Sequence, residues 1–170
     1  IGKGGRRVWI QATYNPVFDS RGEVSGVVKF ATDISAQKEA EAESRGVHDA
    51  IDRVSGVIEF ELDGTVITAN DNFLRAVGYE LAEIQGRHHS MFCEAVYKDS
   101  ADYRRFWEKL GSGQFDAGRY LRIGRDGRQV WLQASYNPIF NAEGRPYKVM
   151  KFATDITAEI TASHMNAVYR

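Results

Sequence analysis

Five runs of residues after position 55 have the composition and alternation typical of β-strands. Two short runs are separated by Asp63-Gly64, a dipeptide common in hairpin turns. Three longer runs with turn residues between them follow near the end of the chain. The predicted strands are residues 57–62, 65–68, 115–123, 128–137 and 147–156.

Helical spacing replaces the strand pattern between the second and third runs. Asn70 or Asp71 can cap a short helix at 72–77, and a second short helix is predicted at 81–85. Ser100 can cap a longer helix that ends at Gly111. Its apolar side chains fall at i, i+3, i+4 and i+7 and are Tyr103, Phe106, Trp107 and Leu110. Residues 87–99 are expected to be irregular.

This order predicts an α+β fold in which a five-stranded antiparallel sheet has helices packed on one face, with a central cavity between the layers. Alternation in strand 128–137 turns Val130, Leu132, Ala134 and Tyr136 inward. In the last strand, Val149, Lys151 and Ala153 share one face. The outer face carries Trp131, Met150 and Phe152, and we expect it to be covered by a linker helix with Val47, Ile51 and Val54 at helical spacing, or by a dimer mate.

An internal repeat is the strongest signal in the chain. Residues 1–35 align without a gap to residues 123–157, and about twenty of the thirty-five positions are identical. We therefore expect a fragment with four parts: 1–35 as the C-terminal strands of a preceding copy, 36–54 as a solvated linker helix broken at Gly46, 55–157 as a complete domain, and 158–170 as an outgoing segment. Because two strands cannot form a core, residues 1–35 are predicted to dock on the complete domain or to pair with the sheet of another chain. Pairing with another chain includes domain swapping.

The composition of the chain argues against several classes of protein. The 170 residues contain 22 Lys and Arg against 23 Asp and Glu, a net charge of −1, which disfavours an electrostatic nucleic-acid binder. The 43% hydrophobic content is enough for a core. A single cysteine excludes an internal disulfide framework and suits a reducing compartment, so a cytoplasmic location is expected. No run is long and apolar enough for a membrane span within this fragment.

Catalytic and metal-binding motifs are missing from the sequence. It contains no glycine-rich phosphate loop, nucleophile elbow, paired-carboxylate motif or metal-ligand spacing. We therefore expect that the chain is not an enzyme, and we assign no catalytic or metal-ligating residues.

Several short segments together resemble a PAS domain: Asn70-Asp71-Asn72-Phe73, Gly78-Tyr79, Glu83 to Gly86 and the closing Asp155-Ile156-Thr157. More narrowly, HHSMFC (88–93), YRRFWEKL (103–110) and the repeated VW(L/I)QA(S/T)YNP and KFATDI resemble tandem-PAS methyl-accepting chemotaxis proteins, with aerotaxis receptors more distant. The resemblance implies the PAS fold and a sensor that holds a small ligand or cofactor between helices and sheet. Such modules pass its state to an output domain through flanking helices.

The resemblance and the predicted faces suggest two sets of functional residues. The expected pocket residues are Asn70, Phe73, His89, Trp107, Tyr120, Leu132, Tyr136 and Ala153. For the aromatic members, ordinary core packing is the alternative interpretation. The expected signal-relay residues are Asp33, Ser35, Asp155 and Thr157, which end each repeat where a helix leaves the sheet. For these four, local helix capping is the alternative.

The cofactor stays open among flavin, haem and none. Aerotaxis receptors hold FAD in this fold, and Trp107 lies near the position of one of their aromatic residues, but Cys93 and Glu94 replace their Arg-His pair. His88 or His89 could ligate haem or could simply make loop hydrogen bonds. Cys93 is expected to be a buried bystander, because the reactive cysteine of LOV-type domains would fall at His89.

The leading hypothesis is a cytoplasmic sensory PAS module of a chemoreceptor-like signal transduction protein that senses a small ligand, redox state or oxygen. The alternative is a structural dimerisation or spacer module without a ligand. A homodimer is expected through the linker helix, the outer sheet face or swapped N-terminal strands. The output signalling domain would lie outside this fragment.

Overall fold

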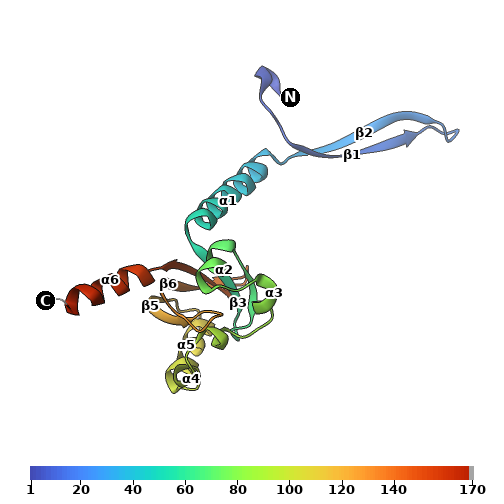
Figure 1. The fold of residues 1–170 in the computed structure, drawn as a ribbon. Coiled ribbons are helices and arrows are strands. Elements are labelled where there is room, and N and C mark those ends of the chain that lie inside the picture. The colour runs from blue at the N-terminus through green and yellow to red at the C-terminus, as the bar shows by residue number, and fades with distance from the viewer. Residues whose placement is uncertain (169–170) are drawn as a thin grey trace. The chain divides into compact units, whose positions relative to one another are not determined.

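The computed structural model describes residues 1–168 and divides them into two compact units on either side of residue 50. Each unit is described by itself. The second contains one five-stranded sheet of order β4-β3-β7-β6-β5, in which every neighbouring pair is antiparallel (Figure 1). Its strands are β3 (Gly56–Glu61), β4 (Val66–Ala69), β5 (Asp116–Ile123), β6 (Gln129–Phe140) and β7 (Pro146–Asp155). The predicted α+β fold with a five-stranded antiparallel sheet is confirmed.

The helices of this unit follow β4 and β7. Four of them and one 3₁₀ turn lie between β4 and β5: α2 (Asp71–Val77), α3 (Leu81–Ile84), η2 (His89–Phe92), α4 (Ala95–Lys98) and α5 (Ala101–Gly111). Helix α6 (Thr157–Val168) leaves the sheet after β7. Asn70 caps α2 by accepting a hydrogen bond from the Phe73 backbone N–H, and Ser100 caps α5 by accepting one from the Tyr103 N–H.

The predicted inward face of the sheet is confirmed. Val130, Leu132, Ala134 and Tyr136 of β6 are all buried, as are Val149, Lys151 and Ala153 of β7. These side chains form one core with buried residues of β3, α2 and α5, among them Phe60, Phe73 and Leu110. The period-two pattern identified this face because only one side of each strand is fully covered.

Two local expectations were wrong. Residues 87–99 are not wholly irregular, because η2 and α4 each form a single turn that is too short for a periodic signal. Strand β6 continues past Asn137 to Phe140, through Pro138. Proline is tolerated there because β5 pairs with β6 only as far as Tyr136, so Pro138 has a partner strand on one side only.

Helix α1 (Ser35–Val54) runs through Gly46 without a break. The predicted interruption at Gly46 was therefore wrong. One glycine costs a helix interior only about 1 kcal/mol relative to alanine, and the Ala- and Glu-rich flanks favour helix. Val47 and Val54 of the predicted apolar stripe are exposed, and the dimer contact proposed for this helix stays a prediction.

The first unit contains a β-hairpin of β1 (Ile10–Phe18) and β2 (Val24–Asp33), preceded by the short turn η1 (Lys3–Gly5). Its register repeats that of β6 and β7: Ile10 pairs with Asp33 as Leu132 pairs with Asp155. The shift in strand register just before Phe18 also recurs just before Phe140. The sequence repeat is therefore also a repeat of backbone structure.

The two hairpins differ in how much of their apolar side chains is exposed to solvent. Tyr14 is 66% exposed, whereas its repeat partner Tyr136 is fully buried. Ile10 and Val27 are also exposed, while their partners Leu132 and Val149 are buried. A two-stranded sheet cannot bury its own face. The expectation that this hairpin docks or pairs elsewhere stays a prediction.

Candidate functional site

A chain of hydrogen bonds crosses the core of the second unit. Arg122 Nη2 of β5 donates to the Tyr136 hydroxyl oxygen of β6 at 3.0 Å. That hydroxyl lies 3.0 Å from His89 Nε2, and His89 Nδ1 lies 2.9 Å from the hydroxyl of Tyr103 on α5. His89, Arg122 and Tyr136 are all almost completely buried. This hydrogen-bond chain therefore connects the sheet to η2 and α5 through polar groups.

The direction of these hydrogen bonds follows from the residue types. A guanidinium can only donate, so the Tyr136 oxygen accepts from Arg122 and its own proton is free for His89 Nε2. We assign the imidazole proton to Nδ1, which then donates to Tyr103. Burial raises the pKa of Tyr136 to about 12, and burial with the charges of Arg122 and Lys151 lowers the pKa of His89 well below its ordinary value. Both groups are therefore neutral.

Aromatic rings occupy the space around this chain. Phe106 lies edge-on to Tyr136 with ring centroids 4.9 Å apart, and Phe60 lies 5.3 Å from the His89 ring. Phe73 and Phe92 meet edge to face at 5.7 Å. Such separations are those of rings in contact. These side chains therefore occupy the region between sheet and helices in which we predicted a cavity.

Two basic side chains lie in this core without a carboxylate partner. Arg122 is 3% exposed and Lys151 is 1% exposed, and neither forms an ion pair with any residue in the described part of the chain. Lys151 Nζ instead lies over the rings of Tyr136 and Phe73, at 4.8 and 5.4 Å from their centroids. Burial, followed by the charge of Arg122, lowers the pKa of Lys151 well below its ordinary value.

Two clefts open on the surface of this unit. The larger, about 630 Å³, lies beside α5 and is lined by Leu62, His88, Trp107 and neighbouring residues. The smaller, about 390 Å³, lies where edge strand β5 meets α4, and it includes Tyr97, Tyr120, Arg122 and Trp131. Both clefts are open to the surface of the unit.

The structure brings together most of the predicted pocket residues. Phe73, His89, Leu132, Tyr136 and Ala153 are buried in the core, with Trp107 and Tyr120 packed against it. Asn70 instead forms hydrogen bonds to backbone groups. Its side chain accepts from the Val57 and Phe73 backbone N–H groups and donates to the carbonyl oxygen of Ser55. Asn70 therefore joins the end of α1 to β3 and α2.

Three buried polar residues around Tyr136 were not predicted from the sequence as site residues: Tyr103, Arg122 and Lys151. Tyr103 was placed only in the apolar stripe of its helix, and Lys151 was placed inward by parity without a role. Arg122 could have been found by the same alternation, because it shares a face with Tyr120 two residues earlier. An inward-pointing arginine is unusual enough to indicate a site.

The histidines do not fit haem ligation in this arrangement. Both ring nitrogens of His89 are within hydrogen-bond distance of tyrosine hydroxyls. His88 is engaged in the same way, with Nδ1 at 3.0 Å from Ser90 Oγ and Nε2 at 2.8 Å from the Asp63 carbonyl oxygen. Iron ligation needs a free nitrogen lone pair. Among the described residues, no group of three or more His, Cys, Asp or Glu side chains could hold a metal ion either.

The core does not fit a flavin ring as it stands. A flavin would need the space that Phe60, Phe106, His89 and Tyr136 occupy in mutual contact. Trp107, the residue that the resemblance linked to FAD, lines the larger cleft instead. Cys93 is 8% exposed with its sulfur 3.7 Å from His89 Nδ1, and burial raises the pKa of its thiol. A buried, protonated thiol is a poor nucleophile.

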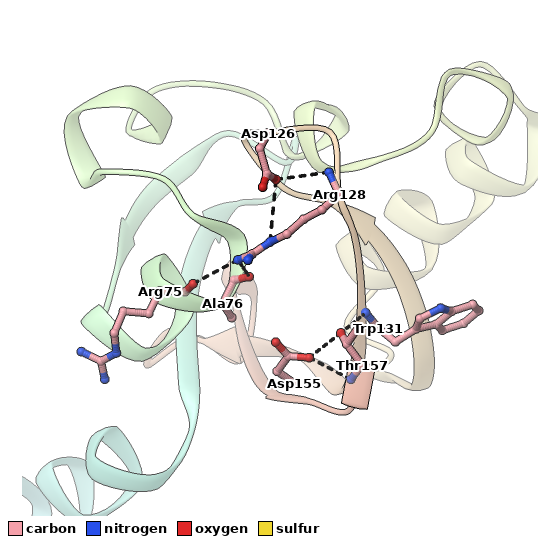
Figure 2. Close-up of polar contacts among 7 residues, drawn as sticks. All are labelled: Arg75, Ala76, Asp126, Arg128, Trp131, Asp155 and Thr157. Carbon is pink, nitrogen blue, oxygen red and sulfur yellow. Dashed lines mark hydrogen bonds and ion pairs between the residues drawn. The ribbon is translucent and has the colours of Figure 1, made fainter. Parts of the chain in front are cut away.

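The four predicted relay residues form the same junction twice. In the second unit, Asp155 Oδ1 accepts from the Thr157 backbone N–H at 2.9 Å, and Thr157 Oγ1 accepts from the Trp131 N–H at 2.9 Å (Figure 2). The Ile156 N–H donates to the Trp131 carbonyl oxygen at 2.8 Å. This arrangement binds the end of β7 and the first turn of α6 to the start of β6.

Each of these bonds recurs 122 residues earlier. Asp33 Oδ1 accepts from the Ser35 N–H at 2.9 Å, Ser35 Oγ accepts from the Trp9 N–H at 2.9 Å, and the Ile34 N–H donates to the Trp9 carbonyl oxygen at 2.9 Å. Hydrogen bonds from Ser35 lower the pKa of Asp33. Both repeats thus attach their outgoing helix to the sheet by one geometry.

A second contact, also drawn in Figure 2, lies just before the first residue of β6. Arg128 Nη2 donates to the Ala76 carbonyl oxygen at 2.9 Å, at the C-terminal end of α2. The Arg125 backbone N–H donates to the Val77 carbonyl oxygen at 2.9 Å. The turn between β5 and β6 therefore satisfies carbonyl groups that the end of α2 leaves free. Arg128, which precedes β6, therefore contacts α2, and Trp131, three residues later in β6, contacts α6.

The five-stranded antiparallel sheet of order β4-β3-β7-β6-β5, with helices inserted between β4 and β5, defines an α+β module of the PAS class. The chain belongs to the PAS family: the PAS fold family matches residues 66–153, and a PAS domain family matches residues 1–36.

Two curated relatives match most of this chain. Biofilm dispersion protein BdlA of Pseudomonas aeruginosa is 46% identical over 157 residues, which cover 92% of this chain and 38% of BdlA. The oxygen sensor protein DosP of Escherichia coli is 25% identical over 160 residues, 92% of this chain and 20% of DosP. The chain thus spans well under half the length of these relatives.

Solved structures share the fold. A PAS domain from Colwellia psychrerythraea aligns with a TM-score of 0.58 and 17% identity, over 67% of this chain and 97% of that domain. An RNA-binding light-oxygen-voltage receptor aligns with a TM-score of 0.60 and 21% identity, over 92% of this chain and 42% of the receptor. In the described residues, no helix has the length and hydrophobicity needed to cross a membrane.

Proposed function

We propose that the chain is a sensory module of a chemoreceptor-like signal transduction protein, and that it performs no catalysis. It would respond to a small ligand, redox state or oxygen and would act on an output domain through α6. The observation that carries this proposal is the junction of Asp155, Thr157 and Trp131, repeated as Asp33, Ser35 and Trp9. The similarity to BdlA and to the oxygen sensor DosP supports the same class of function.

The junction gives a physical route for a signal. A local change near Tyr136 would shift β6, and Trp131 on the same strand holds Thr157 at the start of α6. Since Thr157 is also bonded to Asp155 of β7, a shift between the two strands would favour a different arrangement of the first turn of α6. In this proposal the Thr157 hydroxyl couples the sheet to the helix.

Replacing Thr157 with valine tests this coupling in the full-length protein. Thr157→Val keeps the shape of the side chain and removes both the acceptor for the Trp131 N–H and the hydroxyl that donates to Asp155. We expect the stimulus-dependent output to fall severalfold, while the free energy of unfolding drops by only about 1 kcal/mol. Output is measured at matched protein levels, and stability is measured by urea unfolding.

Thr161→Val is the matched control. Thr161 lies one turn further along α6, and its hydroxyl donates only to the Thr157 carbonyl oxygen within the helix. This variant is expected to signal normally. A normal output from Thr157→Val, or an equal loss in both variants, would contradict the role of the junction.

A spacer that dimerises without any ligand is the second candidate. The ring contacts of Phe60 with His89 and of Phe106 with Tyr136 support it, because a cofactor between the sheet and the helices would have to displace them. The absorbance spectrum of freshly purified protein separates the cofactor hypotheses. We expect neither flavin bands nor a haem Soret band, and either signal would show that the core repacks around a cofactor.

A further inference from the structure

The smaller cleft contains an arginine that is not fully paired. Arg122 lines this cleft although it is only 3% exposed. Its Nη1 donates to the Leu121 carbonyl oxygen at 2.7 Å and its Nη2 donates to the Tyr136 hydroxyl. Its Nε–H is buried and has no hydrogen-bond acceptor. A buried donor without a hydrogen-bond acceptor destabilises the fold unless an acceptor is supplied.

The charges around Arg122 leave this donor uncompensated. Lys151 contributes a second buried basic group on the other side of Tyr136. The one carboxylate on β5 is that of Asp116, which is already bonded to Lys109 at 2.7 Å and to the Tyr120 hydroxyl at 2.5 Å. Glu94 and Arg119 line the cleft as exposed residues of opposite charge. Buried cations are normally paired, so the site lacks an anion.

Three of the seven residues that line the cleft are aromatic, and the lining comes from both faces of the sheet edge. Tyr120 and Arg122 belong to the inward face, while Trp131 pairs opposite Leu121 on the outward face. Tyr97 of α4 lies across from them. The cleft can reach both faces because β5 is the edge strand of the sheet. Its volume of about 390 Å³ falls in the range of small-molecule sites.

We propose that this cleft binds a small organic carboxylate with a planar, apolar body. The carboxylate accepts a hydrogen bond from Arg122 Nε–H, and the rings of Tyr97, Tyr120 and Trp131 contact the body of the ligand. A guanidinium is the side chain best suited to a planar carboxylate. The aromatic walls favour such a ligand over a compact, strongly hydrated anion such as phosphate.

This inference deepens the proposed sensory function and rests on it for its biological role. Trp131 belongs to both sites: its side chain lines the cleft, and its backbone N–H is held by Thr157 Oγ1. Arg122 is connected through Tyr136 to the polar chain of the core. A ligand in the cleft therefore contacts the strand residue that holds the start of α6.

Benzoate is the probe for the test, titrated into the purified chain by calorimetry at constant ionic strength. Saturable binding to the wild type is expected. Benzyl alcohol, which lacks the charge, and inorganic phosphate, which lacks the apolar body, are expected to bind at least about tenfold more weakly. That factor corresponds to the loss of one hydrogen bond to a charged group.

Arg122→Gln is expected to weaken benzoate binding by at least about tenfold. Arg105→Gln makes the same change in charge on an exposed residue of α5 that pairs with Asp102, and it should bind benzoate like the wild type. If circular dichroism shows that Arg122→Gln does not fold, Tyr97→Glu replaces it. That change places a carboxylate on a half-exposed cleft wall and should abolish binding by repulsion.

The proposal is overturned if benzoate does not bind saturably, if phosphate binds as tightly as benzoate, or if the folded Arg122 or Tyr97 variant binds it unchanged. These results leave the Thr157→Val experiment untouched, because that experiment uses no benzoate. A failed ligand assignment and a failed relay can therefore be distinguished.

Discussion

Phe60→Ala is expected to lower the free energy of unfolding of the second unit by about 3–5 kcal/mol. Phe60 is fully buried at the centre of the core. Its ring contacts those of His89, Trp107 and Tyr136, with centroids 5.3, 5.6 and 6.5 Å away. Removing the ring leaves a cavity among groups held by the polar chain, so the neighbours cannot close it fully. Urea unfolding followed by far-ultraviolet circular dichroism measures the change.

Phe115→Ala is the matched control for that prediction. Phe115 directly precedes β5 and is 66% exposed, so its truncation removes few packed contacts. The expected change is within about 0.5 kcal/mol. If Phe60→Ala cost no more than Phe115→Ala, the interior would be loosely packed and a cofactor would have room between the layers.

Lys151→Met is expected to stabilise the folded state at neutral pH, by about 1–4 kcal/mol. Lys151 is 1% exposed, has no carboxylate partner and is held only over two aromatic rings. Methionine fills a similar volume in an apolar environment and carries no charge to desolvate. Lys148→Met, three residues away on β7, should have the opposite sign, because Lys148 pairs with Glu59 at 2.6 Å.

The stabilisation should depend on pH in a defined direction. Burial lowers the pKa of Lys151 in the folded state below its ordinary value of 10.5, so the unfolded chain binds this proton first as the pH falls. Wild-type stability attributable to Lys151 is therefore complete above pH 10.5 and is lost below it, by up to about 1.4 kcal/mol per pH unit, until the folded pKa is reached. The advantage of Lys151→Met should shrink as the pH rises from 7 to 10.

Urea unfolding curves of the wild type and of Lys151→Met between pH 7 and 10 give the difference in their free energies of unfolding. The contributions of the other titrating groups cancel in this difference. A difference that stays constant with pH would mean that the amine keeps its ordinary pKa and is better solvated than its burial indicates. A destabilised Lys151→Met variant at pH 7 would mean that the ring contacts outweigh the cost of burying the amine.

The sheet, its inward face and the repeat could be predicted because each depends on local patterns. Alternation along 128–137 placed Leu132 and Tyr136 inward, since a strand turns every second side chain to the same side. The identity of the two repeats predicted the junction residues Asp33 and Asp155, whose hydrogen bonds span only two residues. Local geometry of this kind is encoded within a short segment.

The candidate site was less predictable because its members are distant in sequence. His89 and Tyr136 are 47 residues apart, and only the closure of the sheet against η2 brings their polar atoms within 3.0 Å. No periodicity indicates that Tyr103 completes the pair on the other ring nitrogen. Asn70 was assigned to the pocket because its amide is polar, yet its side chain bonds Val57 of β3, Phe73 of α2 and Ser55, which follows α1.

By itself, the sequence determined the order of strands and helices, the buried side of the sheet and the membership of one family, since hydrophobic spacing and turn residues act over a few positions. Only the tertiary structure decided that aromatic rings lie in contact between the sheet and the helices. It alone brought Arg122 and Lys151 together around Tyr136 without a carboxylate. The physical reason is that packing and charge compensation depend on neighbours from several elements, and these neighbours meet only when the chain has folded.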